Sequence, residues 1–141
     1  MGNLVLDEGL LTSQEDEEVR TLARARTLTI LGQLDGARKR SVVQFLYESQ
    51  LIQKDKPIVS LSGADLTDAD LSGADLRGAD LRVAALRRAN LSRAVLFDVD
   101  LSHARLRGAD LSGIRGVTPE ELEDTAYSLS GTTMSDGSAH D

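Results

Sequence analysis

The residues of this chain that could do chemistry are its aspartates, several of which recur at intervals that are multiples of five. They occupy positions 65, 70, 75, 80, 100 and 110. Two carboxylates can serve as general acid and general base when a cleft drives their pKa values apart. On a surface without a cleft the same aspartates are ordinary solvated side chains, and we favour this interpretation.

Other catalytic and metal-binding chemistry finds little support in the composition. The chain has no cysteine, which removes disulfides, thiolate nucleophiles and cysteine-ligated zinc. The two histidines, His103 and His140, lie far apart, so no multi-histidine metal site is expected. We therefore expect no catalytic, cofactor-binding or metal-binding residue and predict that the protein is not an enzyme.

Charge and aromatic content argue against direct binding of nucleic acid. The 141 residues include 16 Lys and Arg against 23 Asp and Glu, a formal net charge of −7, and 3% are aromatic. Binding phosphates requires a basic surface, and binding bases requires aromatic platforms. The sequence also lacks the run of about 20 apolar residues that a membrane span needs. We expect a cytoplasmic chain without a membrane span.

The strongest pattern in the sequence is a leucine at every fifth position. A period of five spreads side chains around a helix and alternates them across one strand, so neither element gathers the leucines on a face. Alanine or valine precedes each leucine by two residues, and turn-forming pairs such as Ser62-Gly63 often follow it. Each unit is therefore predicted to be a very short strand and a bend, winding into a solenoid with leucine and alanine inside. The predicted core leucines are Leu61, Leu66, Leu71, Leu76, Leu81, Leu86, Leu91, Leu96, Leu101, Leu106 and Leu111.

These eleven units, purest in Ala64-Asp65-Leu66 and Ala74-Asp75-Leu76, resemble the pentapeptide-repeat family. The resemblance implies a mainly β solenoid, a right-handed quadrilateral β-helix, with four units per coil and residues twenty apart stacked. Residues 58–116 would make just under three coils. On this stacking Asp80 lies near Asp100.

Both ends of the solenoid need caps, because each would otherwise expose an open core and unpaired edges. Residues 1–57 are predicted to be a helical segment, with helices at about 14–34 and 37–52 that form a hairpin on the first coil. Thr118-Pro119-Glu120-Glu121 has the pattern of a capping box and predicts a capping helix within 117–130. Residues 131–141 are expected to be a flexible acidic tail.

The N-terminal segment resembles a second, narrower context. Residues 19–29 and 44–48 are similar to the stretch before the repeats in certain bacterial pentapeptide-repeat proteins, in which transmembrane helices often come earlier still. This leaves open whether Met1 is the native start or a membrane segment precedes it. With such a segment, the chain would lie at the inner face of the membrane.

Two surface features could bind a partner. Stacking at twenty places Arg87 beside Arg107, with Arg88 and Arg105 at the edges of the same face. This is either a docking patch for an acidic protein or anionic lipid headgroups, or a solvated face, and the solvated face is the favoured interpretation.

The second feature is a pair of apolar residues at positions that are polar elsewhere in the repeat. Val95 and Phe97 flank Leu96 and are expected to point outward. They either mark a contact surface or lie under a terminal helix or loop.

The sequence leaves two functions open. The first is a non-enzymatic protein-interaction or scaffold module, whose partner is another protein or a second copy held through the N-terminal helices. The alternative, which the family resemblance implies, is a DNA-mimic modulator of DNA gyrase or topoisomerase. Such a mimic needs a long acidic rod, whereas residues 58–116 carry eight acidic and eight basic residues.

Overall fold

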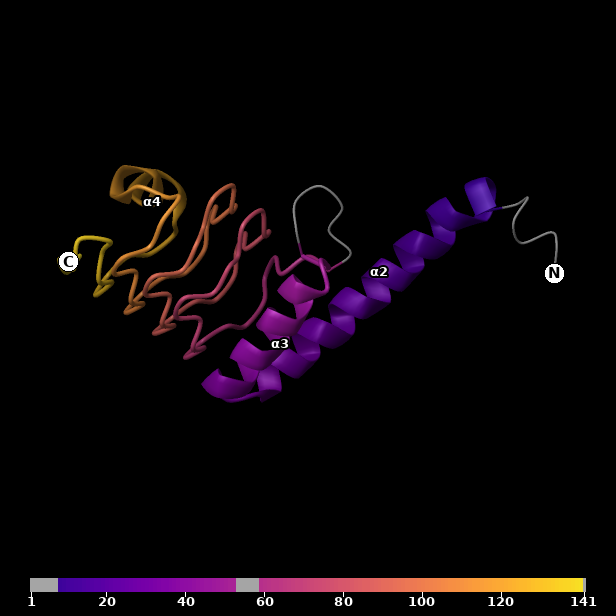
Figure 1. Ribbon diagram of the computed structural model, residues 1–141, viewed down its shortest axis with the longest axis horizontal. Coiled ribbons are helices and arrows are strands. Elements are labelled where there is room, and N and C mark those ends of the chain that lie inside the picture. Colours follow the sequence, from indigo (N-terminus) through magenta and orange to yellow (C-terminus); the bar gives the residue numbers. More distant parts are fainter. Residues whose placement is uncertain (1–7, 53–58, 141) are drawn as a thin grey trace.

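The computed structural model describes residues 8–52 and 59–140, with side chains from residue 17 onward. Helices α2 (Glu8–Gln33) and α3 (Gly36–Glu48) lie at one end of a stack of coils, and α4 (Pro119–Thr125) lies near the other end (Figure 1). In the described ranges the coils pair through single-residue bridges, without an extended strand. None of these three helices combines the length and apolar character that a membrane span requires.

Each coil takes twenty residues. Asp65 pairs with Ala85, and Ala85 pairs with Arg105, in parallel bridges, and the same separation recurs on the other three sides of the coil. Backbone hydrogen bonds join each coil to the next, such as the one from Leu66 N–H to the Ala85 carbonyl at 2.8 Å. Twenty residues are four five-residue units, so the repeats form a β-solenoid.

Leucine fills the interior of the solenoid. None of the eleven repeat leucines is more than 4% exposed. Burying one leucine side chain contributes about 1.5–3 kcal/mol to folding. The small residue two places earlier shares the interior with it, because residues two apart in an extended stretch point to the same side. The core is therefore one continuous column along the stack.

The repeat aspartates close the turns between units. Each of the six accepts a hydrogen bond from the backbone N–H two residues later, at 2.9–3.3 Å. This is the local bond that aspartate typically makes in turns. The residue two places after each leucine then has a positive φ, whether it is a glycine, as at Gly63, or not, as at Val83. The aspartates thus have a structural role beyond solvation.

The N-terminal helices supply hydrogen bonds to the first coil. In later coils, the carbonyl of the residue after each leucine accepts a backbone N–H from the preceding coil, as Arg82 does from Gly63 at 2.8 Å. The first coil has no preceding coil, so the equivalent carbonyls would be unpaired. Three side chains donate to them instead: Arg24 Nη2 to Ser62 O at 2.6 Å, Lys39 Nζ to Thr67 O at 2.9 Å and Arg40 Nη1 to Ser72 O at 2.7 Å.

The observed helices differ in length from those expected. α2 begins at Glu8 rather than near residue 14, and α3 ends at Glu48 rather than near residue 52. α3 stops there because Gln50 adopts a positive φ of 58°, which leaves the helical region. Residues 1–7 and 53–58 of the predicted helical segment lie outside the described residues.

The C-terminal segment is not the helix and flexible tail that the sequence predicts. α4 ends at Thr125, and residues 126–140 continue the solenoid as a partial further coil. Arg105 bridges to Ser128, a separation of 23 residues instead of twenty, because α4 is inserted in this turn. The expectation of helix to residue 130 and of a loose tail is therefore wrong for residues 126–140. Leu129-Ser130-Gly131 has the signature of the earlier units, which could have revealed this coil.

The end of the chain folds back over this last coil. Thr133 pairs with Ala139 in an antiparallel bridge, and the Met134 N–H donates to the Ser138 carbonyl at 2.7 Å. Leu129 and Met134 are buried beneath this fold-back.

The predicted capping box of α4 is confirmed, because the Thr118 side chain accepts from the Glu121 N–H while the Glu121 side chain accepts from the Thr118 N–H.

Candidate functional site

The arginine cluster, defined as Arg87, Arg88, Arg105 and Arg107, lies on one side of the second and third coils. Arg105 belongs to the column of bridges that begins at Asp65. Arg87, Arg88 and Arg107 line a hollow of about 400 Å³. Its remaining wall is formed by Gly108, Ser130 and Gly131, so the last coil contributes to the site.

The side chains of three arginines of this cluster have no partner among the residues that the structure describes. Arg88 forms a two-bond ion pair with Asp68, at 2.9 and 3.1 Å. The guanidinium groups of Arg87, Arg105 and Arg107 make no hydrogen bond or ion pair with any residue that the structure describes. The cluster therefore carries positive charge that the solenoid does not neutralise.

Other arginines of the solenoid are distributed differently. Arg77 is paired with Asp75 at 2.7 Å, and Arg82 with Asp80 at 2.8 Å. Arg93 and Arg115 are unpaired within the described ranges, but each stands in a different column from the cluster and from the other. The arginine cluster thus holds three guanidinium groups on one side that are unpaired within the described part of the chain.

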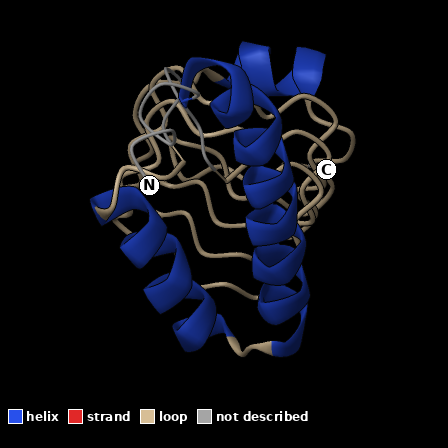
Figure 2. Ribbon diagram, turned by 90° about the vertical axis from the view of Figure 1, so that its right-hand side faces the viewer, coloured by secondary structure: helices blue, strands red, loops and turns tan. Residues whose placement is uncertain are grey.

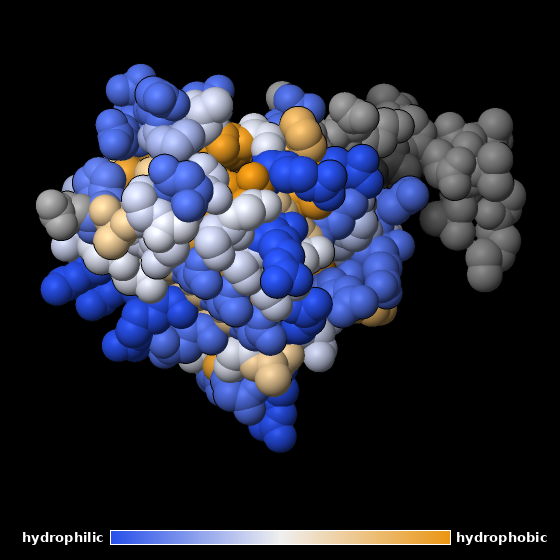
Figure 3. Space-filling view, turned by 60° about the vertical axis from the view of Figure 1, so that its left-hand side comes forward, coloured by the Kyte–Doolittle hydropathy of each residue, from blue (hydrophilic) through white to orange (hydrophobic). Residues whose placement is uncertain are grey.

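The apolar pair does not join the arginine cluster. Phe97 is 49% exposed, whereas Val95 is half-buried between its bridge partners Asp75 and Arg115. Both lie ten residues, or half a coil, from the units that carry Arg87 and Arg107. The two features predicted from the sequence thus face opposite sides of the solenoid. Figure 3 shows one face of the molecule, where hydrophilic side chains predominate and hydrophobic ones form small separate areas.

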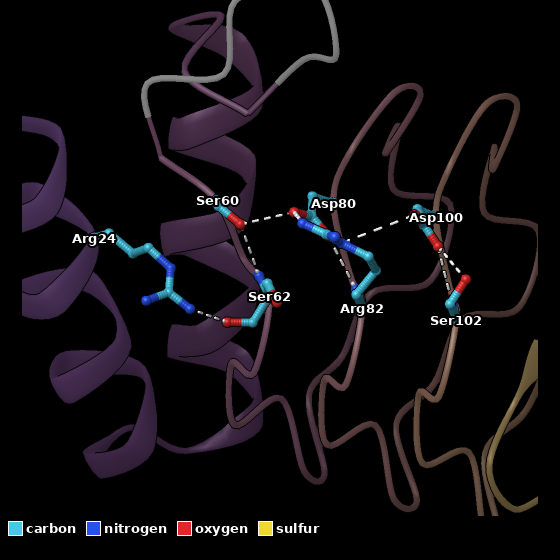
Figure 4. A network of polar contacts seen from close by, with 7 residues as sticks. All are labelled: Arg24, Ser60, Ser62, Asp80, Arg82, Asp100 and Ser102. Atoms are coloured by element: carbon cyan, nitrogen blue, oxygen red, sulfur yellow. Dashed lines mark hydrogen bonds and ion pairs between the residues drawn. The ribbon is translucent and has the colours of Figure 1, made fainter. Parts of the chain in front are cut away.

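The aspartate pair noted in the sequence is held together by an arginine. Asp80 and Asp100 are bridge partners in adjacent coils, and Arg82 lies between them, 2.8 Å from Asp80 and 3.8 Å from Asp100 (Figure 4). Ser60 also donates to Asp80 at 3.0 Å. The hydrogen bond from Arg82 is the main reason that the pKa of Asp80 is lowered. A general acid needs a raised pKa, so this environment favours a permanently ionised carboxylate instead.

A hollow of about 620 Å³ lies beside this pair, which contradicts the expectation of a rod without a cleft. It forms where α4 is inserted between the third coil and the partial last coil. Glu121 and Thr125 of α4 line it together with Asp80, Arg82 and Asp100. Within the described part of the chain, no group of three or more His, Cys, Asp or Glu is arranged to hold a metal ion.

A second polar contact, between α3 and the first coil, was not apparent from the sequence. Tyr47 donates its hydroxyl to Asp75 at 2.6 Å and accepts from Arg77 at 3.1 Å. The hydrogen bond to Asp75 is the main cause of the raised pKa of Tyr47. Only the fold brings these residues together, because 28 positions separate Tyr47 from Asp75.

The lowered carboxyl pKa values predict a loss of stability in acid. The pKa of Asp80 is lowered chiefly by Arg82, and that of Asp75 chiefly by Arg77. A lowered folded-state pKa contributes stability above the unfolded value of about 3.9. This contribution is lost as the pH falls below about 4 and through the folded-state pKa. We expect urea midpoints to fall between pH 5 and pH 3, and Asp80→Asn to flatten this fall. An unchanged pH profile in the variant would contradict the assignment.

A comparison with known protein families agrees with the five-residue repeat. The family model described as pentapeptide repeats matches residues 59–82 and 80–113 with eight copies. HetL, a pentapeptide-repeat protein involved in heterocyst differentiation regulation from the cyanobacterium Nostoc sp. strain PCC 7120, is similar at 39% identity with a TM-score of 0.24. The alignment covers 58% of this chain and 41% of HetL. No curated protein sequence matches. The family model spans the leucine ladder, so residues 59–113 of this chain are pentapeptide repeats.

Proposed function

We propose that this chain is a non-enzymatic protein-interaction module whose arginine cluster binds an acidic surface of another protein. The observation that carries the proposal is the absence of an internal partner, among the described residues, for Arg87, Arg105 and Arg107. Elsewhere on the solenoid, Arg77 and Arg82 are neutralised by aspartates two residues earlier. A carboxylate of the partner protein would pair with an arginine of the cluster, as the chain's own aspartates pair with Arg77 and Arg82.

The backbone of the solenoid suits this role because it holds the cluster in place. Arg87 and Arg107 stand on adjacent coils, which are separated by about 4.8 Å in paired β-structure. Guanidinium groups bind carboxylates through two parallel hydrogen bonds, so two stacked arginines favour two neighbouring carboxylates. Membrane-binding basic clusters commonly hold about 4–8 Lys or Arg, and three unpaired arginines are fewer. An acidic protein is therefore the partner we favour over a lipid surface.

The family resemblance supplies the finer description of the module. We assign the solenoid the right-handed quadrilateral form, supported by its four units per coil. The alternative function, a DNA-mimic modulator of gyrase or topoisomerase, is less well supported. Residues 58–116 have a formal charge of zero, whereas DNA carries one negative charge per ~1.7 Å of its axis.

Charge reversal within the cluster tests the proposal. We expect Arg87→Glu with Arg107→Glu to abolish capture of an acidic partner that the wild-type chain retains from host lysate. Arg93→Glu with Arg115→Glu is the matched control, because it changes the net charge by the same amount at unpaired arginines on other columns. The control should retain the partner. The affinity of the identified partner should also fall as salt is raised.

Equal loss in the two double variants would show that net charge, and not the cluster, determines binding. Equal retention would exclude the cluster and direct attention to Phe97 or to the terminal helices. Either result would refute the proposed site. Inhibition of gyrase supercoiling by the wild-type chain, unaffected by the Arg87 and Arg107 reversals, would instead support the alternative function.

A further inference from the structure

Helix α2 presents an apolar stripe to the outside of the molecule. Val19, Leu22 and Ile30 are 62%, 53% and 48% exposed. They lie on one side of the helix, because at 3.6 residues per turn the three positions fall within an arc of about 80°. The opposite side carries Leu31, which is fully buried against the solenoid. We call Val19, Leu22, Arg26 and Ile30 the outer α2 face.

The position of α2 leaves this face open to a second molecule. Figure 2 shows α2 and α3 lying across the end of the stack of coils. α2 has 26 residues and α3 has 13, and Figure 1 shows α2 running on past α3. At about 1.5 Å per residue α2 is about 39 Å long, twice the length of its neighbour. The N-terminal half of α2 therefore extends beyond the helix that packs beside it.

Charge along α2 is divided into an acidic and a basic half. The sequence runs through Glu15 to Glu18, which are all acidic, and then through Arg20, Arg24 and Arg26. Glu18 and Arg26 are exposed, and their side chains make no hydrogen bond or ion pair with another described residue. Each lies four residues from Leu22, on opposite sides of it. A second copy of the same helix, packed antiparallel to the first, would place its basic half against this acidic half.

We infer that two copies of this chain associate through antiparallel α2 helices, with a two-fold axis at Leu22. In that arrangement Leu22 packs on Leu22 of the second copy, and Val19 faces the small Ala25. Glu18 faces Arg26 of the second copy, and the two-fold axis repeats the pair. A parallel arrangement would oppose Glu18 to Glu18 and Arg26 to Arg26, which is repulsive. The charge pattern thus selects a second copy and also its direction.

A charge-swap series measured by sedimentation equilibrium tests this inference. We expect the wild-type chain to dimerise reversibly with concentration, and Leu22→Asp to be monomeric. Arg26→Glu turns two attractive pairs into two repulsive ones, so its dissociation constant should rise roughly tenfold or more. Glu18→Arg should have a similar effect. The double variant with Glu18→Arg and Arg26→Glu restores both pairs and should dimerise like the wild type.

Control variants separate this interface from folding and from the proposed binding site. Val83→Asp makes the same kind of change at a similarly exposed apolar residue of the solenoid and should leave the dimer intact. Arg87→Glu with Arg107→Glu should also leave it intact, since the arginine cluster lies on the side of the coils. Circular dichroism should show native helix content in every variant.

Three results would overturn the inference. One is a wild-type chain that stays monomeric up to millimolar concentration. Another is a double charge-swap variant that dimerises no better than the single variants. The third is a Leu22→Asp variant that dimerises as tightly as the wild type. None of these results would affect the proposed role of the arginine cluster, which is tested by partner capture.

Discussion

Leu86→Asp is expected to abolish cooperative folding of the solenoid. Leu86 is fully buried in the second coil, between Leu66 and Leu106 of the neighbouring coils. A carboxylate there would be surrounded by leucine and alanine, without a cation to pair with it. The cost of burying an unpaired ion is several kcal/mol, against a total stability of about 5–15 kcal/mol for a domain. The variant should show no cooperative thermal transition.

Two milder variants keep this prediction falsifiable. Leu86→Ala should lower the free energy of unfolding by about 2–5 kcal/mol, because it leaves a cavity in the column. Leu86→Met nearly conserves volume and should cost less than about 1.5 kcal/mol. A thermal melt of Leu86→Asp that matches the wild type would show that the leucine ladder does not form the core.

Gly116→Ala is expected to destabilise the end of the solenoid more than any other glycine substitution in the repeats. Gly116 has a φ of 100°, a region that side chains rarely adopt. A methyl group there would collide with Phe97 N and would lie 2.7 Å from Leu96 C and Phe97 Cα. These are backbone atoms of the preceding coil and cannot rotate away. Backbone strain and steric displacement together should cost roughly 2–5 kcal/mol.

Gly63→Ala is the matched control for this effect. Gly63 also has a positive φ, of 74°, but no atom lies within 4 Å of the position that a Cβ would occupy. Its substitution should cost only the backbone strain of about 1–2 kcal/mol. Urea denaturation of the two variants separates strain from collision. Equal losses would show that the close approach of Gly116 to Phe97 contributes nothing.

The spacing of the side chains was sufficient to predict a solenoid, since neither a helix nor a single strand can bury a leucine at every fifth position on one face. The four units per coil were implied by the family resemblance instead. The capping box at Thr118 was equally local, because its hydrogen bonds join residues three positions apart. The final coil was missed because α4 shifts its register to 23 residues and Tyr127 occupies the place of the usual alanine.

The candidate site could be placed with the stacking at twenty that the family resemblance implied, but which of its arginines are paired could not be predicted. Stacking at twenty brought Arg87 and Arg107 onto one side, where the structure shows them lining one hollow. The sequence did not predict which arginines pair with an aspartate. Arg88 is paired with an aspartate twenty residues away, whereas Arg77 is paired with one two residues away. The hollow beside Asp80 was not readable either, because it depends on where α4 is inserted.

The sequence by itself determined the period, the inward residues and the turns, because each is specified within a five-residue unit and repeated. Tertiary structure alone decided how the two ends are completed. Arg24, Lys39 and Arg40 donate to carbonyls 28 to 38 residues away, at positions where a preceding coil would have donated. Such contacts depend on the docking of the helices on the stack, and no local spacing encodes that geometry. Tertiary structure also decided the unpaired charge of the arginine cluster, because it depends on which arginines the folded chain pairs with aspartates.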